Sequence, residues 1–267
     1  MRYGLIVGSR TKDVFNLVND NVASTSQAAA EPFSKQIATI SVVVTLYNEE
    51  DNVEPMTRNI IGTFKEVLQG ADFELILVLN GPLDATPQRA KALTLEFPEI
   101  KLVELTQNRG YGGGIQAGLK SASGEFIGYT DADEQISAAD SAQIFQTALN
   151  GDYDLVKAVR NQRADGLQRR IISTVYNGLF NVLFGFTSMD INGKPKVFRR
   201  AAFQRLNLQS KDWFIDAEAM IQAKRLGFSI HEVPIAFAAR KHGSSNVRFS
   251  TVIEFLKNMW KYRYGQH

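Results

Sequence analysis

The chain has 267 residues, of which 44% are apolar, and a formal net charge of +2. This length and composition allow one large hydrophobic core, as a single domain or as a domain with appendages. The chain has no cysteine and only three scattered histidines, which excludes disulfides, thiolate metal sites and a cysteine nucleophile and disfavours a histidine zinc site.

Residues 1–36 read as an N-terminal extension and linker. A short helix is expected over 12–22, and residues 23–36 form a tether rich in Ser, Ala and Gln. The pattern that follows predicts a main domain over 37–245 and a C-terminal amphipathic helix over 246–267.

From Ile40 onward, short apolar strands alternate with helices. The expected strands cover 40–46, 73–79, 100–105, 126–130 and 155–159, and the expected helices cover 53–68, 86–97, 113–122 and 138–150. Strands of this kind indicate an α/β fold, a mostly parallel sheet with helices on both faces. Ligands of such sheets bind beyond the carboxyl ends of the strands. The polar segments 47–49, 80–81, 108–114 and 131–133 are therefore expected along one rim.

Asp131 and Asp133 follow the predicted strand at 126–130 and are the most informative residues of this rim. Mg²⁺ and Mn²⁺ favour a pair of carboxylates combined with phosphate oxygens of a substrate. Asp-x-Asp is also common in surface turns, so the surrounding motifs decide its meaning.

Basic residues concentrate in the half of the chain after this pair. Between Lys157 and Lys211 there are eleven Lys or Arg residues and two acidic residues, Asp165 and Asp190. This imbalance indicates an anionic substrate or surface. No interleaved aromatic and basic pattern accompanies it, so nucleic acid is not an expected partner.

Four segments, Ser41–Glu50, Asn108–Gly114, Ala122–Phe126 and Asp131–Asp133, occur in an order and spacing that resemble a known family. Together they are similar to the inverting nucleotide-sugar glycosyltransferases of the GT-A fold, and among these to the dolichyl/polyprenyl-phosphate sugar synthases. The resemblance covers roughly residues 40–245. It implies a Rossmann-like, mostly parallel sheet and transfer of a sugar from a nucleoside-diphosphate sugar to a polyprenyl phosphate.

On the donor side, the resemblance implies that Asp131 and Asp133 hold Mg²⁺ or Mn²⁺ against the diphosphate, with Gln135 as a further metal ligand. A divalent ion there offsets charge on the departing nucleoside diphosphate, and Asp133 is counted as catalytic for this reason. The residues expected to bind the donor are Leu46, Tyr47, Asn48, Glu49, Asn80, Asn108, Gly110, Gly112 and Asp131.

Two positions depart from the family pattern. Tyr111 stands where family members often carry Lys, and Leu79–Pro82 replaces an Asp-Asp-Gly-Ser type of turn. Asn80 can still donate to a nucleoside but carries no charge. The choice among guanine, uracil and thymine, and the choice of sugar, therefore stay open.

On the acceptor side, the resemblance implies that Arg160 meets the acceptor phosphate, together with Lys194, Arg199, Arg240 and Ser244. The planar guanidinium holds phosphate through two hydrogen bonds and stays charged. A phosphate monoester is largely dianionic near neutral pH, so its oxygen needs no general base. A glycan hydroxyl, the alternative acceptor, would need a carboxylate, and Asp216 or Glu218 is the candidate base.

Two further alternatives belong to other classes. Gly112–Ala117 fits the G-x-G-x-x-A fingerprint of a dinucleotide-dependent dehydrogenase, but it follows the third predicted strand rather than the first. A non-catalytic GT-A scaffold would fit the departures at Asn80 and Tyr111, whereas the retained Asp131 and Asp133 disfavour it.

Two segments, 169–186 and 249–264, read as amphipathic helices with basic flanks, as in helices that lie in a membrane interface. The apolar faces comprise Ile172, Val175, Tyr176, Leu179, Leu183 and Phe186 in the first and Phe249, Val252, Ile253, Leu256 and Trp260 in the second. No apolar run approaches the ~20 residues that span a bilayer, and the N-terminus lacks a signal peptide. We expect a peripheral protein at the cytoplasmic membrane face, with a membrane-protein partner in place of the spanning helices that many relatives append.

Overall fold

The computed structural model describes residues 39–68, 70–163, 167–186, 188, 190–238 and 249–264. The predicted extension over 1–36 lies outside the described residues. Among the described residues, no helix combines the length and the apolar character needed to cross a membrane.

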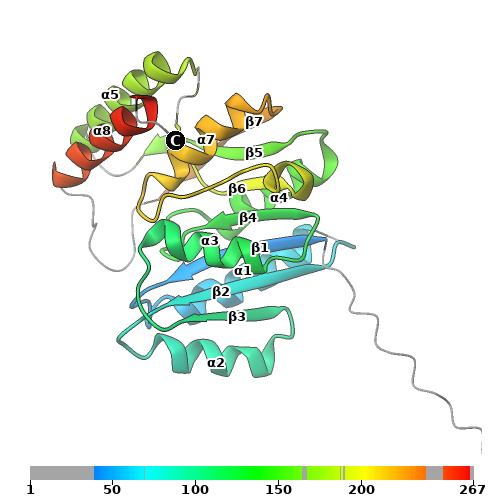
Figure 1. Cartoon of the computed structure of the whole chain (residues 1–267). Helices are drawn as coiled ribbons and strands as arrows, with labels where there is room; N and C mark the ends of the chain where they lie inside the picture. The colour runs from blue at the N-terminus through cyan, green and yellow to red at the C-terminus, as the bar shows by residue number, and fades with distance from the viewer. Residues whose placement is uncertain are drawn as a thin grey trace, which may run out of the picture. The chain divides into compact units, whose positions relative to one another are not determined.

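The described residues form one seven-stranded sheet in the order β3-β2-β1-β4-β6-β5-β7 (Figure 1). The strands are β1 (Ile40–Leu46), β2 (Phe73–Asn80), β3 (Ile100–Leu105), β4 (Phe126–Thr130), β5 (Leu155–Arg163), β6 (Lys196–Arg199) and β7 (Ile230–Phe237). β6 runs antiparallel to its neighbours β4 and β5, and the other pairs are parallel. The predicted α/β fold with a mostly parallel sheet is confirmed.

Helices cover both faces of the sheet. They are α1 (Val53–Val67), α2 (Thr86–Glu96), α3 (Tyr111–Ser121), α4 (Ala138–Asn150), α5 (Leu167–Phe184), α6 (Arg200–Phe203), α7 (Ile215–Arg225) and α8 (Phe249–Tyr264). Successive side chains of a strand point to opposite faces. Val42 and Val44 of β1 accordingly join the core under α1 and α4, and Val43 joins the core under α3 and α7.

Four elements differ from the sequence expectations. Helix α3 begins at Tyr111 rather than at Gly113, and β5 continues to Arg163 because it pairs with β7 beyond Val159. The strands β6 and β7 were not predicted. β6 carries the buried Lys196, and β7 is an edge strand that contains Pro234, so neither shows the apolar run used to find the others.

Helix α5 presents a different face to the domain than its apolar pattern predicted. Asn177 is 6% exposed, and its Oδ1 accepts a hydrogen bond of 3.0 Å from the Ile191 backbone N–H. Val175 and Leu179, both assigned to the apolar face, are exposed. The side of α5 that contacts the sheet domain is therefore mixed: Phe180 is fully buried in the core under α3 and α7, and Asn177 binds the segment that precedes β6.

Candidate active site

The residues after β1 form a tight turn at the carboxyl end of the strand. Asn48 has a positive φ of 54°, and its Oδ1 accepts a hydrogen bond of 2.8 Å from the Leu83 N–H. The Glu49 N–H donates to Thr86 Oγ1 at 2.9 Å. Tyr47 is exposed at this rim, as expected for a residue that binds a ligand.

The side chain of Leu46, a residue expected in the donor site, is fully buried, so any contact with the donor would involve its backbone. Leu46 is the last residue of β1 and its side chain belongs to the core under α1 and α4. An apolar side chain at the end of a buried strand serves the core rather than a ligand, so this part of the rim begins at Tyr47.

Asn80 holds the loop between β3 and α3 in place. It is 2% exposed, its Nδ2 donates to Gly110 O at 3.0 Å, and its Oδ1 accepts from the Arg109 N–H at 2.9 Å. Asn108 Oδ1 in turn accepts from the Gly110 N–H at 2.7 Å. Both amides form hydrogen bonds that shape this loop, and their predicted contact with the donor stays a prediction.

The glycines of this loop permit a close approach to the chain's own backbone. Gly110 has a φ of 78°, and a Cβ there would lie 2.3 Å from Lys211 O. A Cβ on Gly112 would lie 2.3 Å from Ser210 O. The Gly112 N–H donates to Lys211 O at 2.9 Å. At Gly110 and Gly112 the backbone was expected to lie close to the nucleotide sugar, but residues 210–212 occupy this position. Lys211 O also accepts hydrogen bonds from N–H groups at the N-terminus of α3.

Asp131 lies at the carboxyl end of β4 and is held by two side chains from other segments. Lys194 Nζ donates to Asp131 Oδ1 at 2.7 Å, and the Tyr111 hydroxyl donates to the same oxygen at 2.9 Å. Burial alone would raise the pKa of Asp131, but the ammonium of Lys194 and these hydrogen bonds outweigh it and lower that pKa. Asp131 is therefore ionised at neutral pH, as a metal ligand must be.

Asp133 and Gln135 belong to the loop that follows. Asp133 Oδ1 accepts from the Gln135 backbone N–H at 3.2 Å, and Gln135 Nε2 donates to Ala238 O at 3.2 Å. A cavity of about 260 Å³ opens on Asp131 and Gln135 between α1, α4 and the end of β7.

The donor set fits Mg²⁺ or Mn²⁺. In the described part of the chain, no group of three or more His, Cys, Asp or Glu side chains could close around a metal ion. The site instead offers two carboxylates and an amide oxygen, all hard oxygen ligands. Mg²⁺ is usually bound by one or two carboxylates plus waters and substrate phosphates, so Asp131 and Asp133 suit it without a third acidic ligand.

Asp216, the predicted base for a hydroxyl acceptor, is buried in an ion pair. Its Oδ1 accepts from Lys196 Nζ at 2.7 Å and from the Tyr129 hydroxyl at 2.8 Å. Burial lowers the pKa of Lys196 to about 8, although Asp216 opposes this shift. Glu218, the other candidate, accepts from the backbone N–H of Ser210 at 2.8 Å. Asp216 therefore connects α7 to β4 and β6, and Glu218 connects it to residues 209 and 210, so both predicted bases are engaged by partners within the protein.

Arg160 is bound by Asp190 through two hydrogen bonds. Its Nε lies 2.6 Å from Oδ2 and its Nη2 lies 2.7 Å from Oδ1. Burial would raise the pKa of Asp190, but Arg160 lowers it to about 2. Lys157, also buried, donates to Asp190 O at 2.6 Å and to Glu232 at 3.1 Å. Arg160 was expected to bind the acceptor phosphate. In this structure its guanidinium forms both hydrogen bonds with Asp190 instead.

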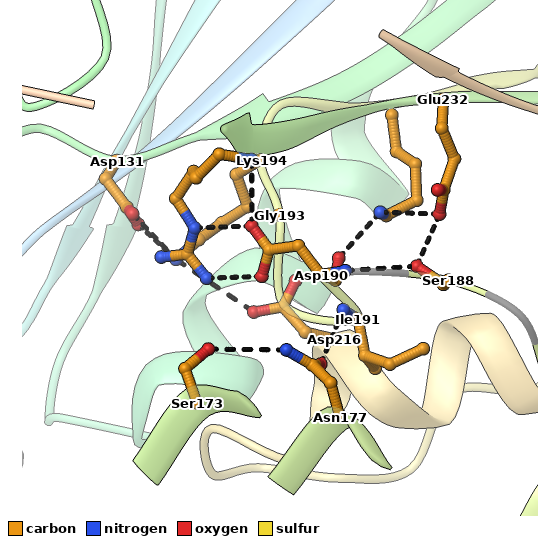
Figure 2. A network of polar contacts seen from close by, with 12 residues as sticks. Asp131, Ser173, Asn177, Ser188, Asp190, Ile191, Gly193, Lys194, Asp216 and Glu232 are labelled. Atoms are coloured by element: carbon orange, nitrogen blue, oxygen red, sulfur yellow. Dashed lines mark hydrogen bonds and ion pairs between the residues drawn. The ribbon is translucent and has the colours of Figure 1, made fainter. Parts of the chain in front are cut away.

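Figure 2 shows that these pairs form one network, in which Lys194 lies between Asp131 and Asp216 with Asp190 beside them. Sequence reasoning counted the basic residues but missed their acidic partners. The signal that was available was Lys157, a lysine inside the predicted strand at 155–159, where an apolar residue is expected. A buried lysine requires an acidic partner.

Arg199 is not at this rim. It pairs with Phe126 at the beginning of β4. Because β6 runs antiparallel to β4, β6 ends where β4 begins, away from the carboxyl ends of the parallel strands. There Arg199 Nη2 donates to Gly151 O at 3.3 Å. Its assignment to the substrate site is therefore corrected. Arg240 and Ser244, the other predicted phosphate ligands, lie outside the described residues.

This sheet, with two carboxylates where β4 ends and a buried network behind them, is that of a GT-A glycosyltransferase. Residues 41–207 match the model of Glycosyl transferase family 2, and the chain belongs to that family. The predicted class, an enzyme that transfers sugars, is confirmed, and the dehydrogenase alternative falls away.

Curated relatives are 28–29% identical to the chain over the aligned residues. It is 29% identical over 202 residues to glycosyltransferase AglD of Haloferax volcanii, a match that covers 73% of the chain and 32% of that protein. It is 28% identical over 228 residues to the undecaprenyl-phosphate 4-deoxy-4-formamido-L-arabinose transferase of Photorhabdus laumondii, covering 84% of the chain and 68% of that protein. The chain thus spans less than a third of the archaeal relative's length.

A solved structure with the same fold is glucosyl-3-phosphoglycerate synthase from Mycobacterium tuberculosis, in complex with Mn²⁺, uridine diphosphate and glucosyl-3-phosphoglycerate. The TM-score is 0.67 at 21% sequence identity, over 86% of this chain and 81% of that one. At this identity the likeness establishes the fold of the chain.

Proposed function

We propose that the chain is a metal-dependent, inverting transferase that moves a sugar from a nucleoside-diphosphate sugar to a polyprenyl phosphate. The observation that carries this proposal is the placement of Asp131 and Asp133 at the carboxyl end of β4, with a lowered pKa at Asp131. The names of the curated bacterial relatives, which are undecaprenyl-phosphate sugar transferases, support the acceptor.

The residues that would hold a divalent cation are Asp131, Asp133 and the amide oxygen of Gln135. Such a cation would supply positive charge that offsets the charge developing on the leaving nucleoside diphosphate. Tyr47 and Glu49 lie at the turn after β1 and are proposed to contact the nucleoside. The exposed ring of Tyr47 offers a surface on which a base can stack.

A phosphate acceptor fits the protonation chemistry of the site better than a glycan hydroxyl. A hydroxyl nucleophile needs a positioned base, and Asp216 and Glu218 are both engaged by partners within the protein. A phosphate oxygen carries its own negative charge and attacks the anomeric carbon without a base. We therefore favour the polyprenyl phosphate over the glycan acceptor.

The proposal places the protein on the cytoplasmic surface of the membrane, where a lipid-borne phosphate would be presented. Helices α5 and α8 lie side by side (Figure 1). Both expose apolar side chains. We call this set, Val175, Leu179, Val182, Leu256, Trp260 and Tyr264, the apolar surface. The exposed Lys257, Lys261 and Arg263 on α8 suit anionic lipid headgroups.

The test is a transfer assay with a panel of UDP-, GDP- and dTDP-sugars that carry a radiolabel, each with undecaprenyl phosphate in detergent and with Mn²⁺ or EDTA. We expect label in the lipid fraction with one donor, and none with EDTA. Undecaprenol, which lacks the phosphate, is the matched control acceptor. Transfer to the alcohol or to a glycan, and none to the lipid phosphate, would refute the proposed acceptor.

A further inference from the structure

Lys194 lies where it can control the affinity of the proposed metal site, so this inference rests on the proposed function. Lys194 Nζ lies 2.7 Å from each oxygen of the Asp131 carboxylate. The lysine is 6% exposed and comes from the segment that leads into β6, a part of the chain remote from Asp131 in sequence. One predicted metal ligand is thus already paired with a cation built into the protein.

A divalent cation and this ammonium cannot share the Asp131 carboxylate without repulsion. Both carry positive charge, and the pair is largely shielded from water, so solvent screens that repulsion weakly. Because Nζ contacts both carboxylate oxygens, a divalent cation that binds either oxygen competes with the ammonium for Asp131. The free energy of breaking the ion pair is subtracted from the affinity of the site for the metal.

A second carboxylate lies within reach of the displaced ammonium. Asp216 Oδ2 is 3.9 Å from Lys194 Nζ, while Oδ1 of the same group accepts from Lys196 and Tyr129. Lysine has a flexible four-carbon stem, so a small movement can exchange one carboxylate for the other. Figure 2 shows Lys194 between the two aspartates.

Tyr111 connects the two members of the pair. Burial, and then the charge of Asp131, raise the pKa of Tyr111 well above its usual value, so its hydroxyl keeps its proton. That hydroxyl donates to Asp131 and accepts from Lys194 Nζ at 2.6 Å. Its ring stacks on Trp213 with centroids 4.0 Å apart, which fixes the position of the hydroxyl.

We propose that Lys194 is the internal counterion of Asp131 and exchanges this partner for Asp216 when a divalent cation binds. Lys194 is then a positioning residue that sets the metal affinity of the enzyme. In this arrangement Asp131 stays ionised, and the ammonium of Lys194 balances its charge until the cation binds with the nucleotide sugar.

The experiment is a titration of the full chain with Mn²⁺ alone, followed by the electron paramagnetic resonance signal of free Mn²⁺. We expect Lys194→Gln to bind Mn²⁺ about fivefold more tightly than the wild type, because the competitor is gone. Lys211→Gln is the matched control: it removes an exposed lysine next to Gly110, where no contact with Asp131 exists, and should change the affinity less than about twofold.

A second variant keeps the test decisive if Lys194→Gln folds poorly. Tyr111→Phe retains the ring but loses the hydroxyl that ties Lys194 to Asp131, so its Mn²⁺ affinity should also rise. A purely structural role of Lys194 predicts the opposite result, a weaker site. Unchanged or weaker Mn²⁺ binding in the folded variants would overturn the inference. A wrong proposed function would give a different result: the wild type would transfer no sugar to undecaprenyl phosphate, whatever its Mn²⁺ affinity.

Discussion

Asp131 and Asp133 are two positions apart but have different surroundings. Asp131 is fixed by Lys194 and Tyr111, whereas Asp133 accepts a hydrogen bond from its own loop at Gln135. Asn at position 133 keeps an oxygen that can accept from the Gln135 N–H, so this loop hydrogen bond is retained while the charge is lost. Loss of this charge should weaken binding of the metal and the diphosphate and should leave the stability of the fold unchanged.

We expect Asp133→Asn to reduce sugar transfer to below about 1% of the wild type, because stabilisation of the leaving diphosphate is lost. Its thermal unfolding midpoint should stay within about 2 °C of the wild type. The lipid-transfer assay and differential scanning calorimetry measure both quantities. Asp152→Asn, the same change at a carboxylate exposed at the opposite edge of the sheet, is the control and should retain full transfer. Near-normal transfer by Asp133→Asn would contradict the mechanism.

The buried pair Arg160–Asp190 predicts that the stability of the fold decreases at low pH. The pKa of Asp190 is lowered from 3.8 to about 2 in the folded chain. A carboxyl with a lowered pKa stabilises the fold above its unfolded pKa, and this contribution disappears as the pH falls through the folded pKa. Between pH 5 and pH 2.5 the pair should lose about 1.5 kcal/mol.

Urea unfolding of the wild type and of Asp190→Asn across that range measures this loss. The difference in unfolding free energy between the two proteins should shrink by about 1.5 kcal/mol as the pH falls, because only the wild type can be protonated at this position. A difference that stays constant with pH would show that Asp190 has an ordinary pKa in the folded chain.

At the scale of elements, the strands with continuous apolar runs were predictable and the strands that contain polar residues were not. β1 and β4 appeared at the expected residues because every side chain in them is apolar or small enough to bury. β6 was missed because Lys196 is buried with Asp216, a partner that only the folded chain supplies. The sequence likewise located the glycine loop before α3 but gave no sign that it contacts residues 210–212.

That contact makes Gly112 a test of how α3 is positioned. A methyl group there would lie 2.3 Å from Ser210 O and 2.8 Å from Asp212 O, both backbone atoms that cannot move alone. We expect Gly112→Ala to destabilise the fold by about 2 kcal/mol and to reduce transfer, since α3 also carries Tyr111. Chemical denaturation gives the first quantity.

Gly62→Ala is the matched control. Gly62 lies within α1, and a Cβ there would meet nothing within 4 Å. Because alanine is the better helix former, this variant should be more stable than the wild type by about 0.5 to 1 kcal/mol. If Gly112→Ala were equally harmless, the close packing of α3 on residues 210–212 would be wrong.

At the scale of the whole molecule, the uneven charge along the chain has an internal explanation. Lys157, Arg160, Lys194 and Lys196, which the sequence suggested as part of a site for an anionic substrate or surface, pair with acidic side chains of the same domain. Arg160 and Asp190 are 30 residues apart and Lys157 and Glu232 are 75 apart, so counting charges along the sequence could not pair them. The cations that remain exposed include those on α8, beside the apolar surface.

The apolar surface on α5 and α8 is therefore the feature that is left to explain how a protein of this class would reach a lipid-borne acceptor. Trp260 is 64% exposed and Leu256 is 42% exposed on the same helix. Tryptophan is enriched at membrane interfaces, and apolar side chains flanked by basic residues bind anionic bilayers. We expect Trp260→Ser to weaken cosedimentation with phosphatidylglycerol vesicles about tenfold, since its ring supplies much of the apolar area. Leu95→Ser, at a 91% exposed position of α2, should bind like the wild type, and equal loss in both variants would argue against a defined membrane surface.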